Sequence, residues 1–501
     1  MLIVGAGPTG LVLALWLTRF GVNVRIIDKL ATSGTTSRAL AVQGRTLEFY
    51  QQFGIAQAVV DRGHKVPALN LWVKSKPAAR IPLGNMGYGL TPFPFPIIFP
   101  QDEHETLLIE RLSALGIEVE RQVELADFED CGGEIRATLR KAGGEEVGSF
   151  AYLAGCDGAR SRVREVLGTG FPGGTYDHLF YVADVEAAGL PMNGELHVDL
   201  DDADFLAVFP LQQTGRARLI GSIRDDAAND QVHLRFEDVQ GRAMQNLRIE
   251  VRKVNWFSTY RVHHRVAQQF RKGRAFLLGD AAHIHSPVGG QGMNTGIGDA
   301  VNLAWKLAAA IKEPRASPLL ESYEPERIAF ARRLVKTTDR AFTAVISSSA
   351  FARFVRTKAI PALAPALFRL PAMRRFAFRT VSQIAVNYRD SPLSHGAAGK
   401  LHGGDRLPWV KVGRGEEHNF AALASMDWQI HVYGDPASGL RALADGRKIP
   451  LQVFPWDAGM RQAGLQRNAA YLIRPDGYIG SADSSGSVAA IGAYLSEKNL
   501  K

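Results

Sequence analysis

The sequence predicts an α/β fold made of a parallel-sheet domain, an inserted antiparallel sheet and a small C-terminal α/β domain. Three observations support this prediction. A strand, a glycine-rich turn, a helix and a second strand follow one another within residues 2–28. Between residues 177 and 262, segments of alternating hydrophobicity are separated by turn residues, as in antiparallel sheets. Beyond residue 428, short strand-like segments alternate with helical ones.

The N-terminal segment has the pattern of a Rossmann-like βαβ unit. Residues 2–4 form the end of a buried strand, residues 10–20 a helix and residues 22–28 a second strand. The first strand is short, so we expect a few further residues upstream of Met1. A glycine turn at a helix N-terminus lets backbone N–H groups approach a pyrophosphate, and a carboxylate about 20 residues later binds ribose hydroxyls. We therefore expect the adenosine end of a dinucleotide to contact Gly5, Gly7, Pro8, Thr9, Gly10, Asp28 and Lys29.

A second glycine-rich segment, residues 279–294, has the same order of strand, glycine turn and helix. It follows an apolar strand (residues 275–278), begins with Gly279 and Asp280, and opens a long apolar helix through residues 287–294 (PVGGQGMN). One glycine loop alone is weak evidence for a dinucleotide site. Two such segments far apart in the chain indicate FAD, whose length requires contacts at both ends.

Composition excludes several classes of function. The 501 residues suffice for two or three domains, and the net charge of +9 includes no block of like charge that requires nucleic acid. An anionic substrate or NADPH would suit this charge, although a solvated basic surface is the simpler interpretation. Only Cys131 and Cys156 occur, which excludes a disulfide framework and predicts a cytoplasmic protein. We expect no membrane span, because the apolar N-terminal run is too short and lacks a basic leader.

We predict four parts along the chain. Residues 1–176 with 263–345 form a discontinuous FAD-binding domain, and residues 177–262 form a substrate-binding sheet with strands over 179–185, 194–200, 205–211 and 217–223. Residues 346–392 are helical, and residues 393–501 form a C-terminal domain whose first part, residues 392–408, is predicted to be a linker. The basic and apolar stretch 351–379 could lie on an anionic membrane. Because Pro361, Pro365 and Pro371 interrupt it, we favour a packed cap or a subunit contact in a homodimer.

Three motifs, in this order, give the chain a resemblance to a known family. They are residues 5–10 (GAGPTG), residues 156–161 (CDGARS), and residues 279–280 (GD) with 287–294. Further matches are residues 37–39 (SRA), 45–48 (RTLE), 100–101 (PQ) and 388–393 (YRDSPL). Over nearly its full length the chain resembles the single-component FAD-dependent aromatic hydroxylases of the p-hydroxybenzoate hydroxylase superfamily. Within it, the chain is most similar to the phenol, pentachlorophenol, hydroxyphenylpropionate and polyketide hydroxylase branch.

The resemblance implies roles for individual residues. Arg38 would contact the flavin, and Gln101 would contact the flavin or its ribityl chain. Asp157 would lie near both FAD and the nicotinamide cofactor. Helix capping is the alternative for Asp157. Asp280 would bind a ribityl hydroxyl. The loop containing Pro287, Gly289, Gly290, Gly292, Met293 and Asn294 would run beside the flavin ring, where a helix N-terminus stabilises negative charge on the reduced flavin.

Two features of the sequence limit the chemistry. His283 and His285 form an HxH pair, but with Asp280 assigned to the cofactor no ligand set remains, so we predict no metal site. The C-terminal domain resembles the thioredoxin-like domain of this branch, including residues 474–478 (RPDGY). It contains no cysteine, which excludes dithiol exchange and leaves packing or dimerisation.

We interpret the chain as a flavin-dependent monooxygenase that hydroxylates a phenol-type ring. By resemblance, NAD(P)H would reduce FAD, and dioxygen would form a flavin C4a-hydroperoxide with an electrophilic distal oxygen. No catalytic base is assigned; the loop residues Pro287, Gly289 and Gly290 are expected to support the chemistry. Alternatives on the same fold are a polyketide-tailoring hydroxylase, an epoxidase or a Baeyer–Villiger oxygenase. An NAD-dependent dehydrogenase would have no use for the second glycine segment.

Overall fold

The centre of the protein is a parallel sheet that contains the N-terminal strand. In the computed structural model, the described residues are 1–34, 39–200, 205–212, 215–223, 234–239, 242–347, 349–413, 415 and 417–500. The strand order is β18-β19-β12-β1-β2-β8, and all neighbours are parallel except β18 and β19. The strands are β1 (Leu2–Val4), β2 (Arg25–Asp28), β8 (Val119–Arg121), β12 (Leu153–Gly155), β18 (Arg271–Lys272) and β19 (Ala275–Leu277).

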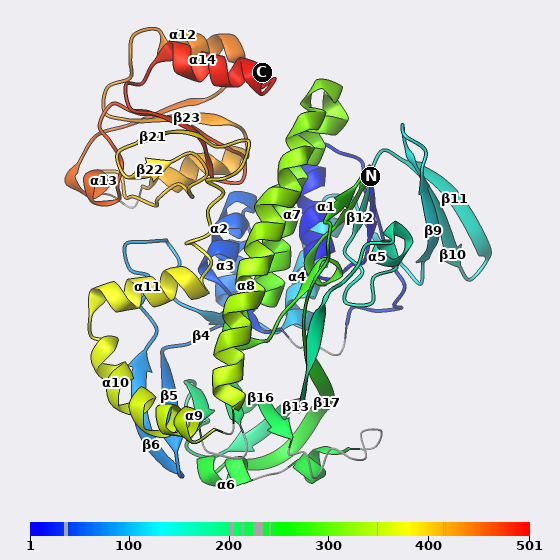
Figure 1. Ribbon diagram of the computed structural model, residues 1–501, viewed down its shortest axis with the longest axis vertical. Helices are drawn as coiled ribbons and strands as arrows, with labels where there is room; N and C mark the ends of the chain where they lie inside the picture. The colour runs from blue at the N-terminus through cyan, green and yellow to red at the C-terminus, as the bar shows by residue number, and fades with distance from the viewer. Residues whose placement is uncertain are drawn as a thin grey trace.

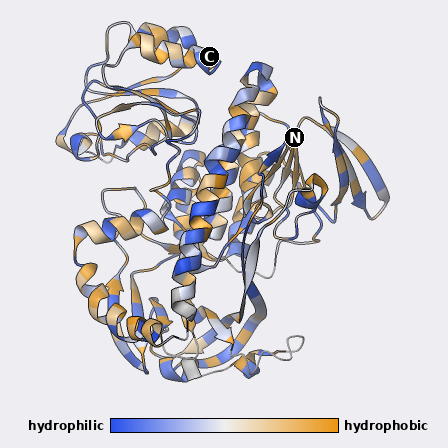
Figure 2. Cartoon of the chain, viewed as in Figure 1, coloured by the Kyte–Doolittle hydropathy of each residue, from blue (hydrophilic) through white to orange (hydrophobic). Residues whose placement is uncertain are grey.

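Two long helices follow the two glycine segments and pack against each other. They are α1 (Pro8–Arg19) and α7 (Gly292–Lys312). Residues 11–17 of α1 are all buried, because α7 and α4 (Gln101–Ser113) also pack against this helix. A helix that is apolar on all sides needs such complete cover. The long helix α8 (Tyr323–Ile346), with one face in solvent, is striped in both hydropathy colours in Figure 2.

A second, larger sheet lies at the opposite end of the molecule from the C-terminal domain (Figure 1). Its strand order is β20-β17-β13-β16-β15-β14-β5-β6. The strands are β5 (Ala68–Val73), β6 (Lys76–Pro82), β13 (Gly173–Ala188), β14 (Leu196–Asp199), β15 (Leu206–Pro210), β16 (Arg216–Ile223), β17 (Glu250–Val266) and β20 (His283–Ile284). The four strands expected between residues 177 and 262 are present. The sheet extends beyond that range, because β5 pairs in parallel with β14 and β20 pairs with β17.

Smaller elements complete the part of the chain before residue 393. Two three-stranded sheets comprise β3 (Ala41–Val42), β7 (Ile97–Ile98) and β4 (His64–Lys65), and β11 (Gly144–Phe150), β10 (Ile135–Lys141) and β9 (Glu124–Asp130). The shorter helices are α2 (Gly44–Phe53), α3 (Ala56–Arg62), α5 (Arg162–Leu167) and α6 (Arg242–Leu247).

The C-terminal domain is a mixed six-stranded sheet with helices. The order is β22-β21-β26-β25-β23-β24, comprising β21 (His395–Ala398), β22 (Leu401–His402), β23 (Gln429–Tyr433), β24 (Leu451–Phe454), β25 (Ala470–Ile473) and β26 (Ile479–Asp483). Its helices are α12 (Leu440–Arg447), α13 (Ala458–Gln462) and α14 (Val488–Glu497). The prediction of a linker over residues 392–408 is therefore wrong. Gly396 and Gly403 serve close backbone packing there, since a Cβ on either would lie 2.3 Å from a backbone atom.

Residues 350–381 are helical, as expected, but they are only partly packed. They form α9 (Ala350–Phe354), a π-helical turn (Val355–Ala359), α10 (Ile360–Leu367) and α11 (Pro371–Val381). Their inner side chains reach the large sheet and the N-terminal domain, whereas many outer apolar side chains are exposed. The inner side is packed and the outer side is exposed, so the choice between a packed cap and a subunit contact stays a prediction. Among the described residues, no helix is both long and apolar enough to cross a membrane.

Candidate active site

The two glycine segments meet at one edge of the parallel sheet. Residues 5–10 follow β1, and Gly279 follows β19, with β12 between these two strands. Carboxyl ends of parallel strands are where α/β proteins bind ligands. The contact is direct, because a Cβ on Gly279 would lie 2.7 Å from Thr9 Oγ1 and one on Gly296 would lie 2.3 Å from the same atom. α1, the Gly279 turn and α7 therefore converge at Thr9.

The first glycine segment is tightly packed on its inner side and open on its outer side. Gly5 has a φ of +104°, and a Cβ there would lie 2.3 Å from Cys156 O. A Cβ on Gly10 would lie 2.0 Å from Gly5 O. By contrast, a Cβ on Gly7 would meet nothing within 4 Å. Pro8 begins α1, and no side chain caps this N-terminus, so the turn presents backbone N–H groups to an open space, as a phosphate requires.

Asp28 connects the end of β2 to the first glycine segment. Its Oδ2 accepts a hydrogen bond from Ala6 N at 2.7 Å, and its Oδ1 accepts one from Leu30 N at 2.8 Å. Each carboxylate oxygen retains a further lone pair, so ribose hydroxyls can still donate to it. Lys29 is exposed beside it. The position expected for the ribose contact is thus directly next to the phosphate turn.

The second glycine segment is held in place by Asn294 and Gln43. Asn294 Oδ1 accepts hydrogen bonds from Gln43 N (2.9 Å) and Thr46 Oγ1 (2.8 Å), and its Nδ2 donates to Ala41 O and Gly290 O at 2.8 Å each. Gln43 Nε2 donates to Gly289 O at 2.9 Å. These bonds use all four hydrogen-bonding positions of the Asn294 amide. The Asn294 side chain therefore shapes the loop, and sequence reasoning missed its partner Gln43.

The loop before α7 adopts backbone conformations that favour glycine. Gly289 and Gly290 have φ values of +76° and +60°. A Cβ on Gly290 would lie 2.6 Å from Ala41 Cβ, so the loop rests directly on β3. Pro287 is exposed, and Met293 packs against the main core. Gly292 begins α7, whose N-terminus has no side-chain cap.

Asp299 is a buried carboxylate that sequence reasoning missed. Its Oδ2 accepts from Gly279 N (3.0 Å) and lies 2.7 Å from His283 Nε2, while its Oδ1 accepts from Arg327 Nε at 2.5 Å. Burial alone would raise the pKa of this carboxyl, but Arg327 and His283 lower it below its usual range. The signal in the sequence is that Asp299 is the one acidic residue of α7. His283 thus has a carboxylate as its hydrogen-bond partner, and no metal-ligand cluster occurs within the described ranges.

His285 carries an unpaired polar atom next to the start of α7. Its Nδ1 lies 2.8 Å from Ser286 O, which makes Nδ1 the donor and leaves Nε2 as an acceptor. Nε2 is buried and has no partner within the described part of the chain. A Cβ on Gly292 would lie 3.8 Å from it. Burial lowers the pKa of His285 to about 4, so the ring is neutral at pH 7. An unsatisfied buried acceptor at a helix N-terminus fits a site that holds a polar group.

The remaining predicted residues lie around this edge of the sheet with local partners. Asp157 follows β12, and its carboxylate accepts from Ser161 Oγ (2.5 Å) and Val163 N (3.1 Å). Asp157 thus helps to cap the N-terminus of α5, which is the alternative role predicted for it. Burial raises its pKa, although these hydrogen bonds oppose the shift. Gln101 Nε2 donates to Glu105 Oε1 at 2.8 Å, and Gln101 N donates to Ala39 O.

Asp280 and Arg38 are the last two residues predicted to bind the cofactor. Asp280 is exposed in the turn directly after Gly279. Arg38 lies outside the described residues, although its neighbour Ala39 lies beside Gln101. Ala39 O also accepts a hydrogen bond from Arg218 Nη1 at 3.4 Å.

The large sheet meets the same region through one of its faces. Phe209 and Ile220 pack against Leu40 and Ile98. The same cluster includes Ala41 of β3, on which Gly290 rests. Arg218 is buried on this sheet and forms two hydrogen bonds with Asp184, at 2.6 and 2.7 Å. Val208, by contrast, belongs to the core on the other side of the sheet. Phe209 and Val208 therefore lie on opposite faces of the large sheet.

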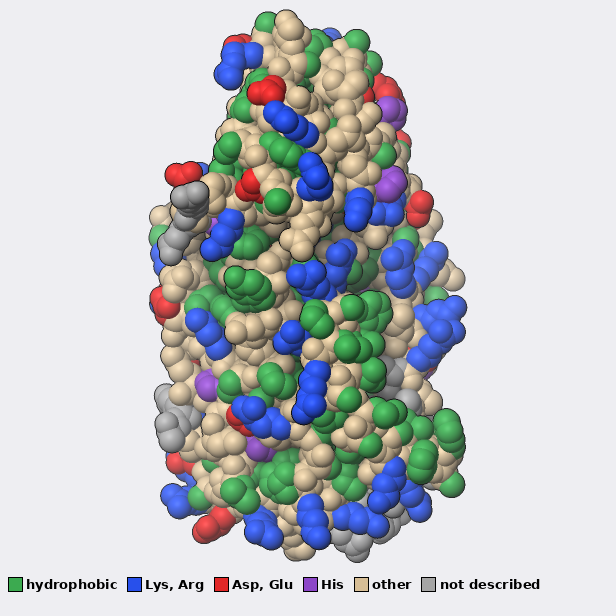
Figure 3. Space-filling view, turned by 90° about the vertical axis from the view of Figure 1, so that its left-hand side faces the viewer, with side chains coloured by type: hydrophobic (Ala, Val, Ile, Leu, Met, Phe, Trp, Pro, Cys, Tyr) green, Lys and Arg blue, Asp and Glu red, His purple; other side chains and the backbone are tan. Residues whose placement is uncertain are grey.

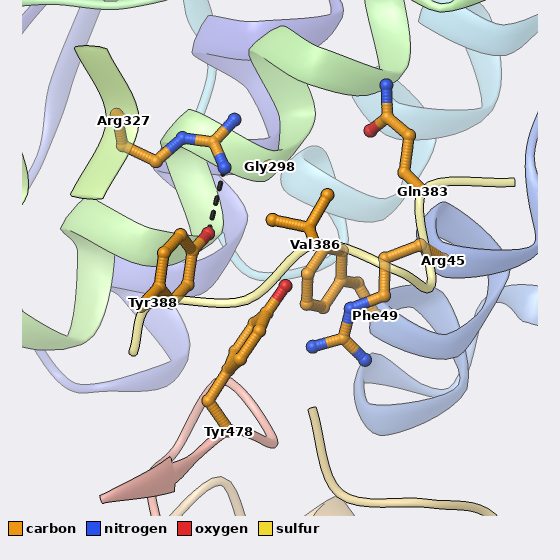
Figure 4. A pocket seen from close by; sticks show the side chains of 8 residues that line it. All are labelled: Arg45, Phe49, Gly298, Arg327, Gln383, Val386, Tyr388 and Tyr478. Carbon is orange, nitrogen blue, oxygen red and sulfur yellow. Dashed lines mark hydrogen bonds between the residues drawn. The ribbon is translucent and has the colours of Figure 1, made fainter. Parts of the chain in front are cut away.

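A small pocket lies where the C-terminal domain docks onto α2, α7 and α8 (Figure 4). Arg327 Nη1 donates to Tyr388 OH at 2.8 Å, and the Tyr388 ring lies 4.4 Å from the Tyr478 ring. On the opposite wall, the Arg45 guanidinium lies over Phe49 and Tyr478 and donates to Asp476 O at 2.7 Å. A chain of contacts thus joins Gly279 to the C-terminal domain through Asp299, Arg327 and Tyr388.

Comparisons with known proteins agree with this geometry. The family model described as "FAD binding domain" matches residues 1–338. The 6-methylpretetramide 4-monooxygenase of Streptomyces rimosus is 34% identical, over 100% of this chain and 93% of the relative. The pentachlorophenol 4-monooxygenase of Sphingobium chlorophenolicum is 31% identical, over 81% of this chain and 75% of the relative. The solved structure of an anhydrotetracycline hydroxylase from Streptomyces rimosus has a TM-score of 0.79 and 28% identity, covering 99% of this chain and 97% of that one.

Proposed function

Because the chain belongs to the FAD-binding-domain family and is an FAD-dependent monooxygenase, we propose that it hydroxylates a phenol-type aromatic ring. The reaction would consume NAD(P)H, a proton and dioxygen, place one oxygen atom on the ring and release the other as water. The observation that carries the proposal is the convergence of both glycine segments at Thr9. This convergence suits a cofactor that needs to be held at two ends.

Specific residues would hold FAD at this edge of the sheet. Gly5 N and Ala6 N donate to Ile27 O and Asp28 Oδ2, so the N–H groups of Gly7, Thr9 and Gly10 would bind the pyrophosphate. Pro8, Thr9, Asp28 and Lys29 would lie toward the adenosine. Asp280 and Gln101 would bind the ribityl chain, and Arg38 would contact the flavin. When bound, FAD supplies electron transfer from NAD(P)H and the activation of dioxygen.

The chain itself would contribute charge stabilisation and a dry site. The uncapped N-terminus of α7 and the N–H groups of Gly289, Gln291 and Gly292 would face the flavin edge where negative charge collects on reduction, whereas Gly290 N donates to Pro287 O. His285 Nε2, an unsatisfied acceptor, would accept a hydrogen bond from a group bound there. Phe209 and the apolar residues around Leu40 would exclude water from the reacting ring.

The domain roles follow from the same proposal. Residues 1–176 and 263–345 would form the FAD-binding domain, and the sheet around residues 177–262 would bind the substrate. Residues 393–501 would be a thioredoxin-like domain used for packing, since they contain no cysteine. NADPH or NADH would approach from the side of Asp157. A homodimer remains a prediction.

A polycyclic polyketide-type phenol is a second candidate substrate. One observation favours it. The relative named for 6-methylpretetramide aligns with the whole chain, including the C-terminal domain, whereas the relative named for pentachlorophenol aligns with 81% of it. Epoxidation and Baeyer–Villiger insertion on such a ring system are the further alternatives, and the identity of the product separates them.

Substrate-stimulated turnover tests the proposal. Purified protein should show a bound-flavin spectrum, and a panel of simple and polycyclic phenols should include members that accelerate NADPH or NADH oxidation together with oxygen uptake. Mass spectrometry should find a product heavier by one oxygen atom. Protein that stays free of flavin after reconstitution with FAD would contradict the assignment, as would a full panel without any hydroxylated product.

A further inference from the structure

Helix α10 has apolar residues on every side, yet one side faces solvent. Its sequence, IPALAPAL over Ile360–Leu367, contains no polar side chain. On the inner side, Ala364 packs with Phe368 against a small cluster around Leu71 and Ile81 of the large sheet. On the outer side, Leu363 is 58% exposed, and Ile360 and Leu367 are exposed as well. An isolated exposed leucine is ordinary, but an entire apolar helix face is not.

The exposed apolar surface continues onto the neighbouring helices. Phe351 on α9 is 77% exposed, and Phe376 on α11 is 69% exposed. Phe354 and Leu370 are exposed between them. We call these side chains, together with the outer face of α10, the 351–381 patch. Figure 3 faces this side of the molecule and shows hydrophobic side chains interspersed with Lys and Arg. Several large apolar side chains exposed on one face of the molecule are typical of an interaction site.

The charge of the patch has one sign. Residues 351–381 contain no Asp or Glu, and their cations are Arg353, Arg356, Lys358, Arg369, Arg374, Arg375 and Arg379. Arg356 is buried, whereas Lys358, Arg369, Arg375 and Arg379 are exposed. Short helices that combine exposed Phe and Leu with Lys and Arg, and lack acidic residues, have the composition of interfacial membrane-binding segments.

The charge of this patch does not suit an interface with a second copy of the chain. Most homodimers are two-fold symmetric, so the patch would face itself. The exposed cations would then lie against each other with no carboxylate from residues 351–381 between them, and like charges brought together in an interface repel each other. An anionic surface with an apolar interior satisfies both the cations and the phenylalanines.

We propose that the 351–381 patch docks the protein on an anionic lipid surface. α9–α11 would lie in the headgroup region, with Phe351, Leu363 and Phe376 inserted among acyl chains and the cations near lipid phosphates. This contact is peripheral and needs no membrane span. It is independent of the proposed reaction, because vesicle binding is measured without turnover.

Vesicle flotation of the FAD-loaded full chain tests this inference. The probes are phosphatidylcholine vesicles with and without about one third phosphatidylglycerol, at low and high salt. One variant, Arg375→Glu with Arg379→Glu, reverses two exposed charges of the patch. A second, Leu363→Ser with Phe376→Ser, removes two of its exposed apolar groups. The matched controls are Arg136→Glu with Arg441→Glu, and Val147→Ser with Leu190→Ser, which change exposed side chains elsewhere.

We expect flotation with the anionic vesicles, weakening at high salt, and little with phosphatidylcholine alone. Each patch variant should lower vesicle partitioning at least about tenfold, while both control variants bind like the wild type. Absence of flotation with anionic vesicles would overturn the inference. Equal binding by patch and control variants would do the same. A third outcome would also overturn it. If Leu363→Ser with Phe376→Ser turned a dimer into a monomer but left the vesicle affinity unchanged, the patch would be a subunit contact.

Discussion

At the scale of single residues, Asp299 holds together parts of the site that are distant in the chain. Its carboxylate contacts Gly279 N, His283 and Arg327, and all of these groups are buried. Arg327 continues the contact to Tyr388 OH and to Thr295 O on α7. The position of the Gly279 turn therefore depends on a charge that is not expected to touch the cofactor. Asp299 is a positioning residue in this structure.

Replacing Asp299 with Asn tests this role. The amide keeps the shape but removes the charge that Arg327 requires, which leaves a buried guanidinium without its counter-ion. We expect a loss of about 3 kcal/mol in the free energy of unfolding and a roughly tenfold weaker affinity for FAD. Thermal unfolding and flavin fluorescence titration measure the two effects. Asp127→Asn, at an exposed position, is the control and should change neither.

Substitution of Gly290 can separate two effects, the strain of a left-handed backbone and the displacement of the loop before α7. Gly290 has a φ of +60° and would place a Cβ 2.6 Å from Ala41 Cβ, whereas Gly89 has a φ of +74° and nothing within 4 Å. Both Gly290→Ala and Gly89→Ala should lose about 1–2 kcal/mol of stability from the left-handed backbone. Only Gly290→Ala should also displace the loop and weaken FAD binding. Equal FAD affinities in the two variants would show that the loop does not contact the flavin.

At the scale of elements, local patterns were sufficient to predict the βαβ unit, the second glycine segment and the strands between residues 177 and 223. Boundaries were less accurate, since β2 begins at Arg25, where pairing with β1 begins, rather than at residue 22. The linker prediction failed because glycines that permit close strand packing look the same in sequence as glycines in a flexible segment. Gln43, His285 and Asp299 were missed because their roles depend on contacts between distant segments.

The docking of the C-terminal domain depends on a buried ion network. Glu326 on α8 accepts hydrogen bonds from Lys306 Nζ (2.8 Å), Arg474 Nη1 (2.8 Å) and Arg474 Nη2 (3.0 Å), and Arg474 also pairs with Asp476. Burial lowers the pKa of Lys306 to about 8, and Glu326 opposes that shift. Burial alone would raise the pKa of Glu326, but Arg474 and Lys306 bring it well below its usual range.

Glu326→Gln should therefore be strongly destabilising. The variant leaves Lys306 and Arg474 with one carboxylate, Asp476, and we expect a loss of about 3–5 kcal/mol, with earlier proteolytic release of the C-terminal domain. Limited proteolysis and thermal unfolding provide the readout. Asp435→Asn breaks the exposed pair with Arg467 and should cost less than about 1 kcal/mol. A Glu326→Gln variant as stable as this control would contradict the role given to the network.

At the scale of the whole molecule, buried neutral histidines make stability depend on pH. Burial lowers the pKa of His104 and His431 to about 3 and that of His197 and His285 to about 4. An unfolded histidine has a pKa near 6.5. Below pH 6.5 the unfolded chain therefore binds more protons than the folded one, and stability falls as the pH falls toward the folded pKa values.

We expect the thermal midpoint to fall steeply between pH 6.5 and 5. Each of these histidines contributes about 1.4 kcal/mol per pH unit in this range. His104→Gln can keep the hydrogen bond to Tyr50 OH and should flatten the slope by up to one histidine's share. His395→Gln changes an exposed ring and should leave the slope unaltered. Scanning calorimetry across this pH range makes the comparison, and parallel slopes for the two variants would refute the assignment.

The shared interior at the C-terminal junction restricts how this protein could be shortened or recombined. Trp305, Ala316 and Leu319 lie in one apolar cluster with Ile430, Val432 and Tyr494. Trp305 Nε1 also donates to Asp476 Oδ2 at 3.1 Å. A truncation before residue 393 would open this cluster to water and leave Glu326 and Lys306 without Arg474. A C-terminal domain taken from a relative would dock on this chain only if the contacting side chains of α7 and α8 were replaced by those of the same relative.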